Sequence, residues 1–177
     1  MKRILILLLM LIPLSAEAQN GGASRYVSAT PTIDTGGAYA SGDLMGGKLT
    51  FTNALRSGVG TGYLAGVNVS DLAAQAVDLD IVIFSANPSA TTFTDQAAFD
   101  IADADIGKVV AVINLGSSSR FAFNDNSVHM IGSLFFPLRA GSSAGPAGTL
   151  YGAVVARGAY TAATAADIVV TLGIAQD

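Results

Sequence analysis

Hydrophobic and polar side chains alternate along much of this chain. Leu49 and Phe51 face one way while their polar neighbours face the other, and the segment 168–174 alternates in the same manner. A period of two is typical of β-strands that bury one face, and clusters of Gly, Asn, Asp, Ser and Pro separate the runs. The pattern predicts strands at 26–29, 47–53, 63–69, 79–84, 109–115, 120–123, 128–138, 149–156 and 167–174.

Two runs, 81–84 and 109–113, are apolar at every position. Such runs predict central strands covered on both faces, or an oligomer interface. On this interpretation, either Ile83→Asp or Val112→Asp should abolish folding, because an unpaired buried charge costs several kcal/mol.

The fold class that these strands predict is a single all-β domain over 26–177, an antiparallel β-sandwich with a jelly-roll-like or related topology. Helix signals are few. Thr94 and Asp95 open a segment that predicts one or two short helical turns around 94–106, with Asp95 as a capping residue. The segment 140–148 predicts a flexible surface loop.

The N-terminus has the three parts of a secretory signal. Lys2 and Arg3 precede an apolar stretch at 4–12, and Ala16-Glu17-Ala18 fits a cleavage site. We expect residues 1–18 to be removed, leaving 19–25 as a flexible lead and an exported protein, periplasmic or extracellular, with no stable membrane insertion. The alternative is a buried N-terminal helix or strand.

The chain has few of the residue types that usually carry out catalysis. After Ala18 the chain has no Glu, Cys or Trp, and its one histidine is His129. General acid-base catalysis, thiol chemistry and transition-metal binding rely mainly on these residue types. We therefore expect no enzyme activity and no cofactor. With a net charge of -4 and no cluster of Lys or Arg, we also expect no nucleic-acid partner.

The only acidic cluster lies at 95–105. Asp100, Asp103 and Asp105 are a weak Ca²⁺ candidate, because their order departs from a D-x-D-x-D-G loop and no Glu completes the shell. Helix caps and solvated carboxylates are the favoured interpretation. His129 lies in an apolar strand, without a G-x-S-x-G motif in the chain, so we expect a structural role for it.

Four aromatic residues gather in the late strands, and buried packing is the default prediction for them, with a surface row that binds a sugar or a protein as the alternative. They are Phe121, Phe123, Phe135 and Phe136. The segment 58–62 (GVGTG) superficially resembles a phosphate-binding loop, but a strand follows it, so we interpret it as an ordinary loop.

Three stretches, SGDLMGGKLTF (41–51), VDLDIVIF with its continuation to Asp105 (77–105), and LYGAVVARG (150–158), resemble small structural proteins from the virion gene regions of tailed bacteriophages and prophages. The resemblance implies a head decoration or cement subunit, a homo-oligomer that contacts the major capsid protein or another virion protein. The apparent signal sequence departs from it, since virions assemble in the cytoplasm. Two rivals remain: an exported surface or periplasmic module that binds carbohydrate or protein, and a carbohydrate-active enzyme using Asp residues of 95–105.

Overall fold

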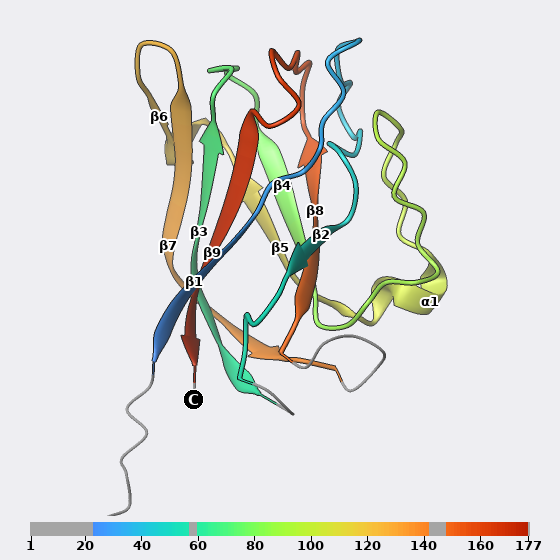
Figure 1. Cartoon of the computed structure of the whole chain (residues 1–177), viewed down its shortest axis with the longest axis vertical. Helices are drawn as coiled ribbons and strands as arrows, with labels where there is room; N and C mark the ends of the chain where they lie inside the picture. The colour runs from blue at the N-terminus through green and yellow to red at the C-terminus, as the bar shows by residue number, and fades with distance from the viewer. Residues whose placement is uncertain (1–22, 57–59, 142–147, 177) are drawn as a thin grey trace, which may run out of the picture.

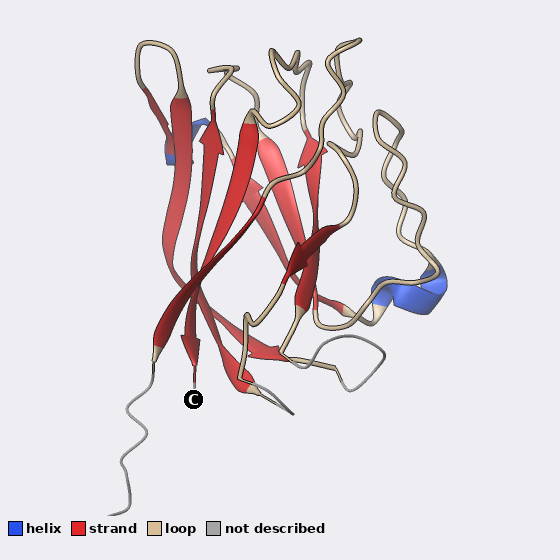
Figure 2. Cartoon of the chain, viewed as in Figure 1, coloured by secondary structure: helices blue, strands red, loops and turns tan. Residues whose placement is uncertain are grey.

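The computed structural model describes residues 23–56, 60–141 and 148–176. In it the chain forms two antiparallel β-sheets that pack face to face (Figures 1 and 2). The expected signal sequence, the first part of the lead, part of the 58–62 loop and most of the 140–148 loop lie outside the described residues.

All nine predicted strands are present. The five-stranded sheet consists, in spatial order, of β1 (Ser24–Ala29), β9 (Ile168–Gln176), β3 (Thr61–Asp71), β7 (Ser127–Arg139) and β6 (Arg120–Ala122). The four-stranded sheet consists of β2 (Leu49–Phe51), β8 (Leu150–Ala156), β4 (Leu79–Phe84) and β5 (Val109–Leu115).

The connectivity is that of a jelly roll. The chain changes sheets after β1, β2, β3, β5, β7 and β8, so strands distant in sequence become neighbours, and β1 pairs with the last strand, β9. Two facing four-stranded arrays, β1-β9-β3-β7 and β2-β8-β4-β5, make up the jelly roll, and β6 adds a fifth strand through its hairpin with β7. The predicted fold class is confirmed.

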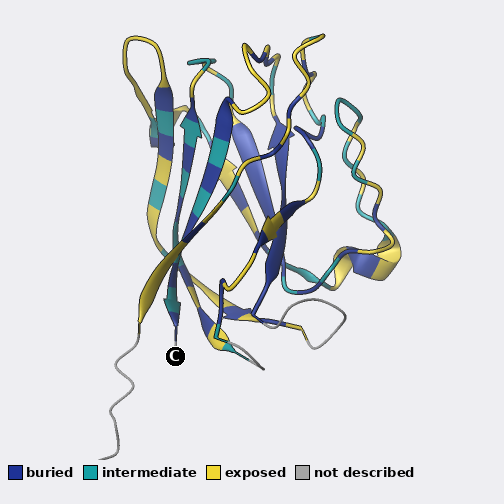
Figure 3. Ribbon diagram, in the orientation of Figure 1, coloured by how far each residue is buried: buried dark blue, intermediate teal, exposed yellow. Residues whose placement is uncertain are grey.

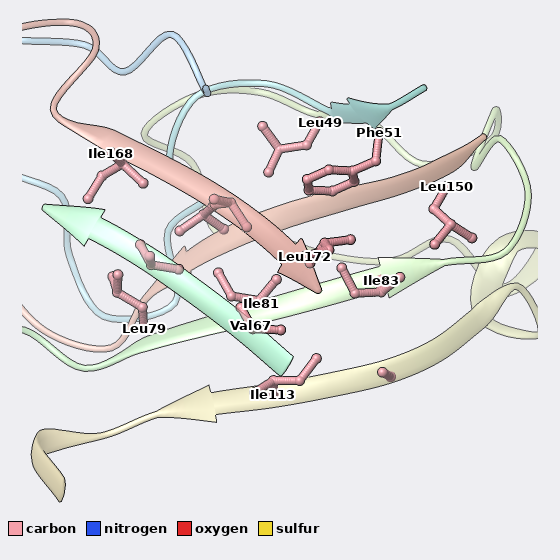
Figure 4. Packing of buried hydrophobic residues seen from close by; sticks show 14 of the residues in the cluster. Leu49, Phe51, Val67, Leu79, Ile81, Ile83, Ile113, Leu150, Ile168 and Leu172 are labelled. Atoms are coloured by element: carbon pink, nitrogen blue, oxygen red, sulfur yellow. The ribbon is translucent and has the colours of Figure 1, made fainter. Parts of the chain in front are cut away.

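The main hydrophobic core fills the space between the sheets (Figure 4). Alternate residues of β3 and β9, such as Val67 and Leu172, point toward Ile81 and Ile83 of β4 and Ile113 of β5. Each fully buried aliphatic side chain of this kind contributes about 1.5 to 3 kcal/mol to folding.

A second hydrophobic layer covers the outer face of the four-stranded sheet. The long connection between β4 and β5 folds back so that Phe93, Phe99 and Ile101 pack against a buried cluster that includes Phe84 and Tyr151. Every residue of β4 is consequently buried, as its doubly apolar sequence predicts.

For β5 the prediction of a central strand covered on both faces is wrong, while its alternative, an oligomer interface, stays a prediction. This strand lies at the edge of its sheet, and Val112, which points away from the core, has 54% of its surface exposed. A charge at position 112 therefore does not enter the core, and the expectation that Val112→Asp abolishes folding is withdrawn.

The helical prediction holds for one turn only, α1 (Asp103–Ile106). Residues 95 and 96 form a turn, and Gln96 has a φ of 57°, outside the right-handed helical region, so no helix runs through 94–99. Ala102, and not an Asp, is at the N-cap position of α1. Within the described part of the chain, no helix is long and apolar enough to cross a membrane.

Candidate functional site

The three candidate calcium ligands do not converge. Asp100 and Asp103 are exposed, whereas Asp105 is buried and accepts hydrogen bonds from the backbone N–H of Ala90 and Thr91 and from the Thr91 hydroxyl. Lys108 lies 2.6 Å from its other oxygen. Among the described residues, no group of three or more His, Cys, Asp or Glu side chains is placed to hold a metal ion.

These contacts assign Asp105 a structural role. The hydrogen bond from Lys108 and those from Thr91 and Ala90 lower the pKa of this carboxyl to about 2, although burial opposes them. The ionised carboxylate ties the start of the β4–β5 connection to α1. It is one anchor of the layer over the four-stranded sheet.

Asp95 is the second anchor of this layer. Its Oδ1 accepts hydrogen bonds from the Tyr39 hydroxyl at 2.8 Å, the Gly46 N–H at 2.6 Å and the Gln96 N–H at 3.0 Å, and its Oδ2 accepts one from the Asp34 N–H at 2.9 Å. The sequence predicts a helix cap here. The carboxylate instead joins the segment 34–46 to the β4–β5 connection, 49 to 61 residues away in sequence.

His129 lies inside the sandwich, near Asp71, Ser127 and Tyr160, and each of these residues is only 1% exposed. Tyr160 donates a hydrogen bond to Asp71 at 2.8 Å, and Ser127 donates one at 3.4 Å. Neither ring nitrogen of His129 has a hydrogen-bond partner. The fold therefore brings a Ser, a His and an Asp into one region, but without the hydrogen bonds of a catalytic triad and without exposure to a substrate.

Burial shifts the pKa values of His129 and Asp71 in opposite directions. It lowers the pKa of His129, an effect that Arg120 reinforces and Asp71 and Asp78 oppose. Burial also raises the pKa of Asp71, despite the hydrogen bond from Tyr160. Both shifts favour the neutral side chain, as expected where water is excluded.

The His129 shift predicts a pH dependence of stability. Below about pH 6.5 the unfolded chain binds a proton that the buried imidazole resists, so the free energy of unfolding falls as the pH falls through that region. His129→Leu removes this contribution and two unpaired buried nitrogens. We expect the variant to be at least as stable as wild type at pH 7. The difference between their free energies of unfolding, measured by urea unfolding, should grow in favour of the variant as the pH falls to about 5. Equal slopes of stability against pH for both proteins would contradict the assignment.

The outer face of the five-stranded sheet carries no covering layer in the described chain. We call it the outer face; its residues lie in four rows across the strands, set by the strand registers. The rows are Phe121, Val128, Ser70 and Val169; Met130, Asn68, Thr171 and Ser28; Gly132, Gly66, Gly173 and Tyr26; and Pro137, Tyr63, Ala175 and Ser24. None of these residues is charged. Figure 3 shows the alternation of buried and partly exposed residues along β3 and β9 that this face produces.

A groove of about 430 Å³ crosses this face. Its floor is the row of glycines, because Gly66 pairs with Gly132 on one side and with Gly173 on the other. A bulge between Leu64 and Gly66 sets this alignment, and a Cβ at Gly66 would lie 2.9 Å from the Ile131 carbonyl oxygen. The Tyr26 ring borders the groove at β1, lies over Gly173, and is 78% exposed.

The aromatic residues of the late strands are on the surface, so the default prediction of buried packing is wrong. Phe121, Phe123 and Phe135 are 58%, 63% and 77% exposed, and Phe136 is 37% exposed. They lie on or beside the short edge strand β6 and on the part of β7 that extends beyond it, where no second layer covers them. The four rings do not form one row, because Phe121 pairs with Val128 near the start of β7, whereas Phe136 pairs with Leu64 toward its end.

Sequence reasoning identified neither the outer face nor its groove. The glycines of the floor are at positions 66, 132 and 173, and only the pairing of β7, β3 and β9 brings them into line. Comparison with protein-family models, with curated proteins and with solved structures finds no match to this chain. The geometry of the described residues therefore carries the functional argument, beside the resemblance already described.

Proposed function

We propose that this chain is a non-enzymatic structural subunit that works through protein–protein contacts, and that it is an auxiliary component of a bacteriophage particle. The observation that carries the proposal is the uncharged, uncovered outer face. Interfaces between proteins are enriched in Tyr, Phe and Met and depleted of charged side chains at their centres. The four rows of this face contain Tyr26, Tyr63, Phe121 and Met130 and no charged side chain.

The fold is compatible with this role. Jelly rolls build viral capsid domains, although the same architecture also occurs in lectins and in enzymes, so the fold alone names no function. The virion assignment comes from the resemblance of 41–51, 77–105 and 150–158 to phage structural proteins. The buried position of His129 and the structural hydrogen bonds of Asp95 and Asp105 support a role without catalysis.

Mass spectrometry of purified phage particles and of the periplasmic fraction from the same induced culture tests the proposal. We expect peptides of this chain in the particles, in a stable ratio to the major capsid protein, and an N-terminus at Gln19 wherever the leader is removed. Detection in the periplasm or medium alone, with particles free of the chain, would contradict the virion assignment.

One observation favours the exported binding module as the second candidate. The groove has an exposed Tyr26 ring at its edge, with Asn68 and Thr171 beside it, and sugars stack on aromatic rings while hydrogen-bonding to such side chains. Binding on a glycan array that Tyr26→Ala abolishes and Phe123→Ala leaves unchanged would favour this candidate. Phe123 is the matched control because it is exposed and does not line the groove.

A further inference from the structure

We infer that the outer face is a homodimer interface, in which the five-stranded sheets of two copies pack against each other. The inference rests on the proposed function, since it names one of the partners that a contact protein uses. The occupant is a second copy of this chain, and three features of the face support that choice: its area, its lack of charge, and the fit between its protruding Tyr26 ring and its glycine groove.

The area matches what a stable dimer needs. Five strands at about 4.8 Å spacing span about 24 Å, and the nine residues of β9 extend about 30 Å, which gives roughly 700 Å² for each copy. A typical specific interface buries about 800 Å² on each partner. A sheet face of this size can pack against another sheet at the usual separation of about 10 Å.

The charge distribution permits self-association. The chain has a net charge of -4, so two copies repel each other unless their charged groups stay apart. The four rows of the outer face contain no ionisable carboxyl, amine, guanidinium or imidazole group. Face-to-face packing of these rows therefore brings no like charges together at the centre of the interface. Arg139, which pairs with Thr61 one row beyond Pro137, stays at its edge.

The shape of the face is self-complementary. Tyr26 protrudes at the β1 end of the glycine row, and Gly132, at the β7 end, has open space where a Cβ would lie. A two-fold axis lying in the interface and parallel to the strands reverses the row end for end. This symmetry places the Tyr26 ring of each copy over Gly132 of its partner, beside Met130, as an isologous contact requires.

Sedimentation velocity on the protein purified from full-length expression tests the interface. We expect wild type to sediment as a dimer at micromolar concentration and Thr171→Arg to sediment as a monomer, with a dissociation constant raised about 100-fold or more, because two added charges meet at the centre of the face. Val112→Arg is the matched control. It places the same charge at an exposed strand position of the other sheet and should remain dimeric.

Circular dichroism and thermal melting of all three proteins show whether they are folded. Loss of the dimer in Thr171→Arg counts as evidence only if this variant has the circular dichroism spectrum of the wild type. If that variant does not fold, Tyr26→Ser replaces it, with Tyr26→Phe as the conservative control. A wild type that remains monomeric at all concentrations, or a folded Thr171→Arg protein that remains dimeric, would overturn the interface.

Cross-linking tests the symmetry, and the absence of natural cysteines simplifies it. The double variant Tyr26→Cys with Gly132→Cys should give a covalent dimer with a short bismaleimide, because the two positions face each other across the interface. Within one copy they are three strand spacings apart, about 14 Å. Each single variant should give little product, and efficient cross-linking of Tyr26→Cys alone would contradict the proposed axis.

The outcomes separate this inference from the proposed function. Monomeric protein that is present in purified particles would contradict the homodimer and leave the virion role in place. Protein that is dimeric but absent from particles would support the homodimer and contradict the virion role. Monomeric protein whose Tyr26 and Asn68 NMR signals shift on adding a glycan would overturn the homodimer and assign the groove to a sugar.

Discussion

Ile83→Asp is expected to abolish folding. Ile83 is fully buried in β4, where it belongs to the core between the two sheets and pairs with Ala111 and Gly152. An unpaired carboxylate at this position costs several kcal/mol in desolvation and also removes the packing of the isoleucine. Because domains of this size are stable by about 5 to 15 kcal/mol, we expect loss of the cooperative thermal transition, measured by circular dichroism.

Val112→Asp is the matched control, because it introduces the same charge into the neighbouring strand at a position that is 54% exposed. A change at such a site usually alters stability by about 0.5 kcal/mol or less. We expect a folded protein with a melting temperature close to that of wild type. Unfolding of this variant together with a folded Ile83→Asp protein would contradict the placement of β4 and β5.

Asp95→Ala is expected to have the second largest effect. The substitution leaves the Gly46 N–H and the Tyr39 hydroxyl without their acceptor on the β4–β5 connection, and it leaves the Asp34 N–H with the Tyr39 hydroxyl alone. Hydrogen bonds to a charged group contribute about 1.5 to 3 kcal/mol each, and these are coupled, so we expect a total loss of about 3 kcal/mol. For a chain of this length that lowers the melting temperature by roughly 10 °C.

Asp100→Ala serves as the control for Asp95→Ala, since Asp100 belongs to the same connection and is exposed. It removes the same charge and should shift the melting temperature by a few degrees at most. Equal losses for the two variants would show that the net charge, and not the hydrogen bonds of Asp95, determines stability in this region.

The strands were predictable because their signal is local. Alternation along 47–53 and 167–174 indicates that one face of each strand is buried, and this holds for any partner strand. All nine predicted runs are strands. The same signal does not report position within a sheet. Residues 79–84 and 109–115 are equally apolar, yet β4 is central and β5 is an edge strand, a difference that depends on which strands pair with them.

The features that required the structure are those that depend on pairing between distant segments. Asp95 after Thr94 has the composition of a helix cap, and only the approach of residues 34–46 turns its carboxylate into a link between loops. The groove depends on a bulge in β3 that aligns Gly66 with Gly132 and Gly173. Glycines at those positions have no common sequence spacing that would indicate a shared surface.

Hydroxyl-radical footprinting at low and high protein concentration tests most directly whether the outer face is a contact surface. Tyr26 and Met130 are 78% and 53% exposed in the single chain, and Phe123, at 63%, is an exposed residue outside the face. We predict that the oxidation of Tyr26 and Met130 falls as the concentration rises, while that of Phe123 stays constant. Oxidation of all three residues that is independent of concentration, and equal in isolated protein and in purified particles, would contradict the account.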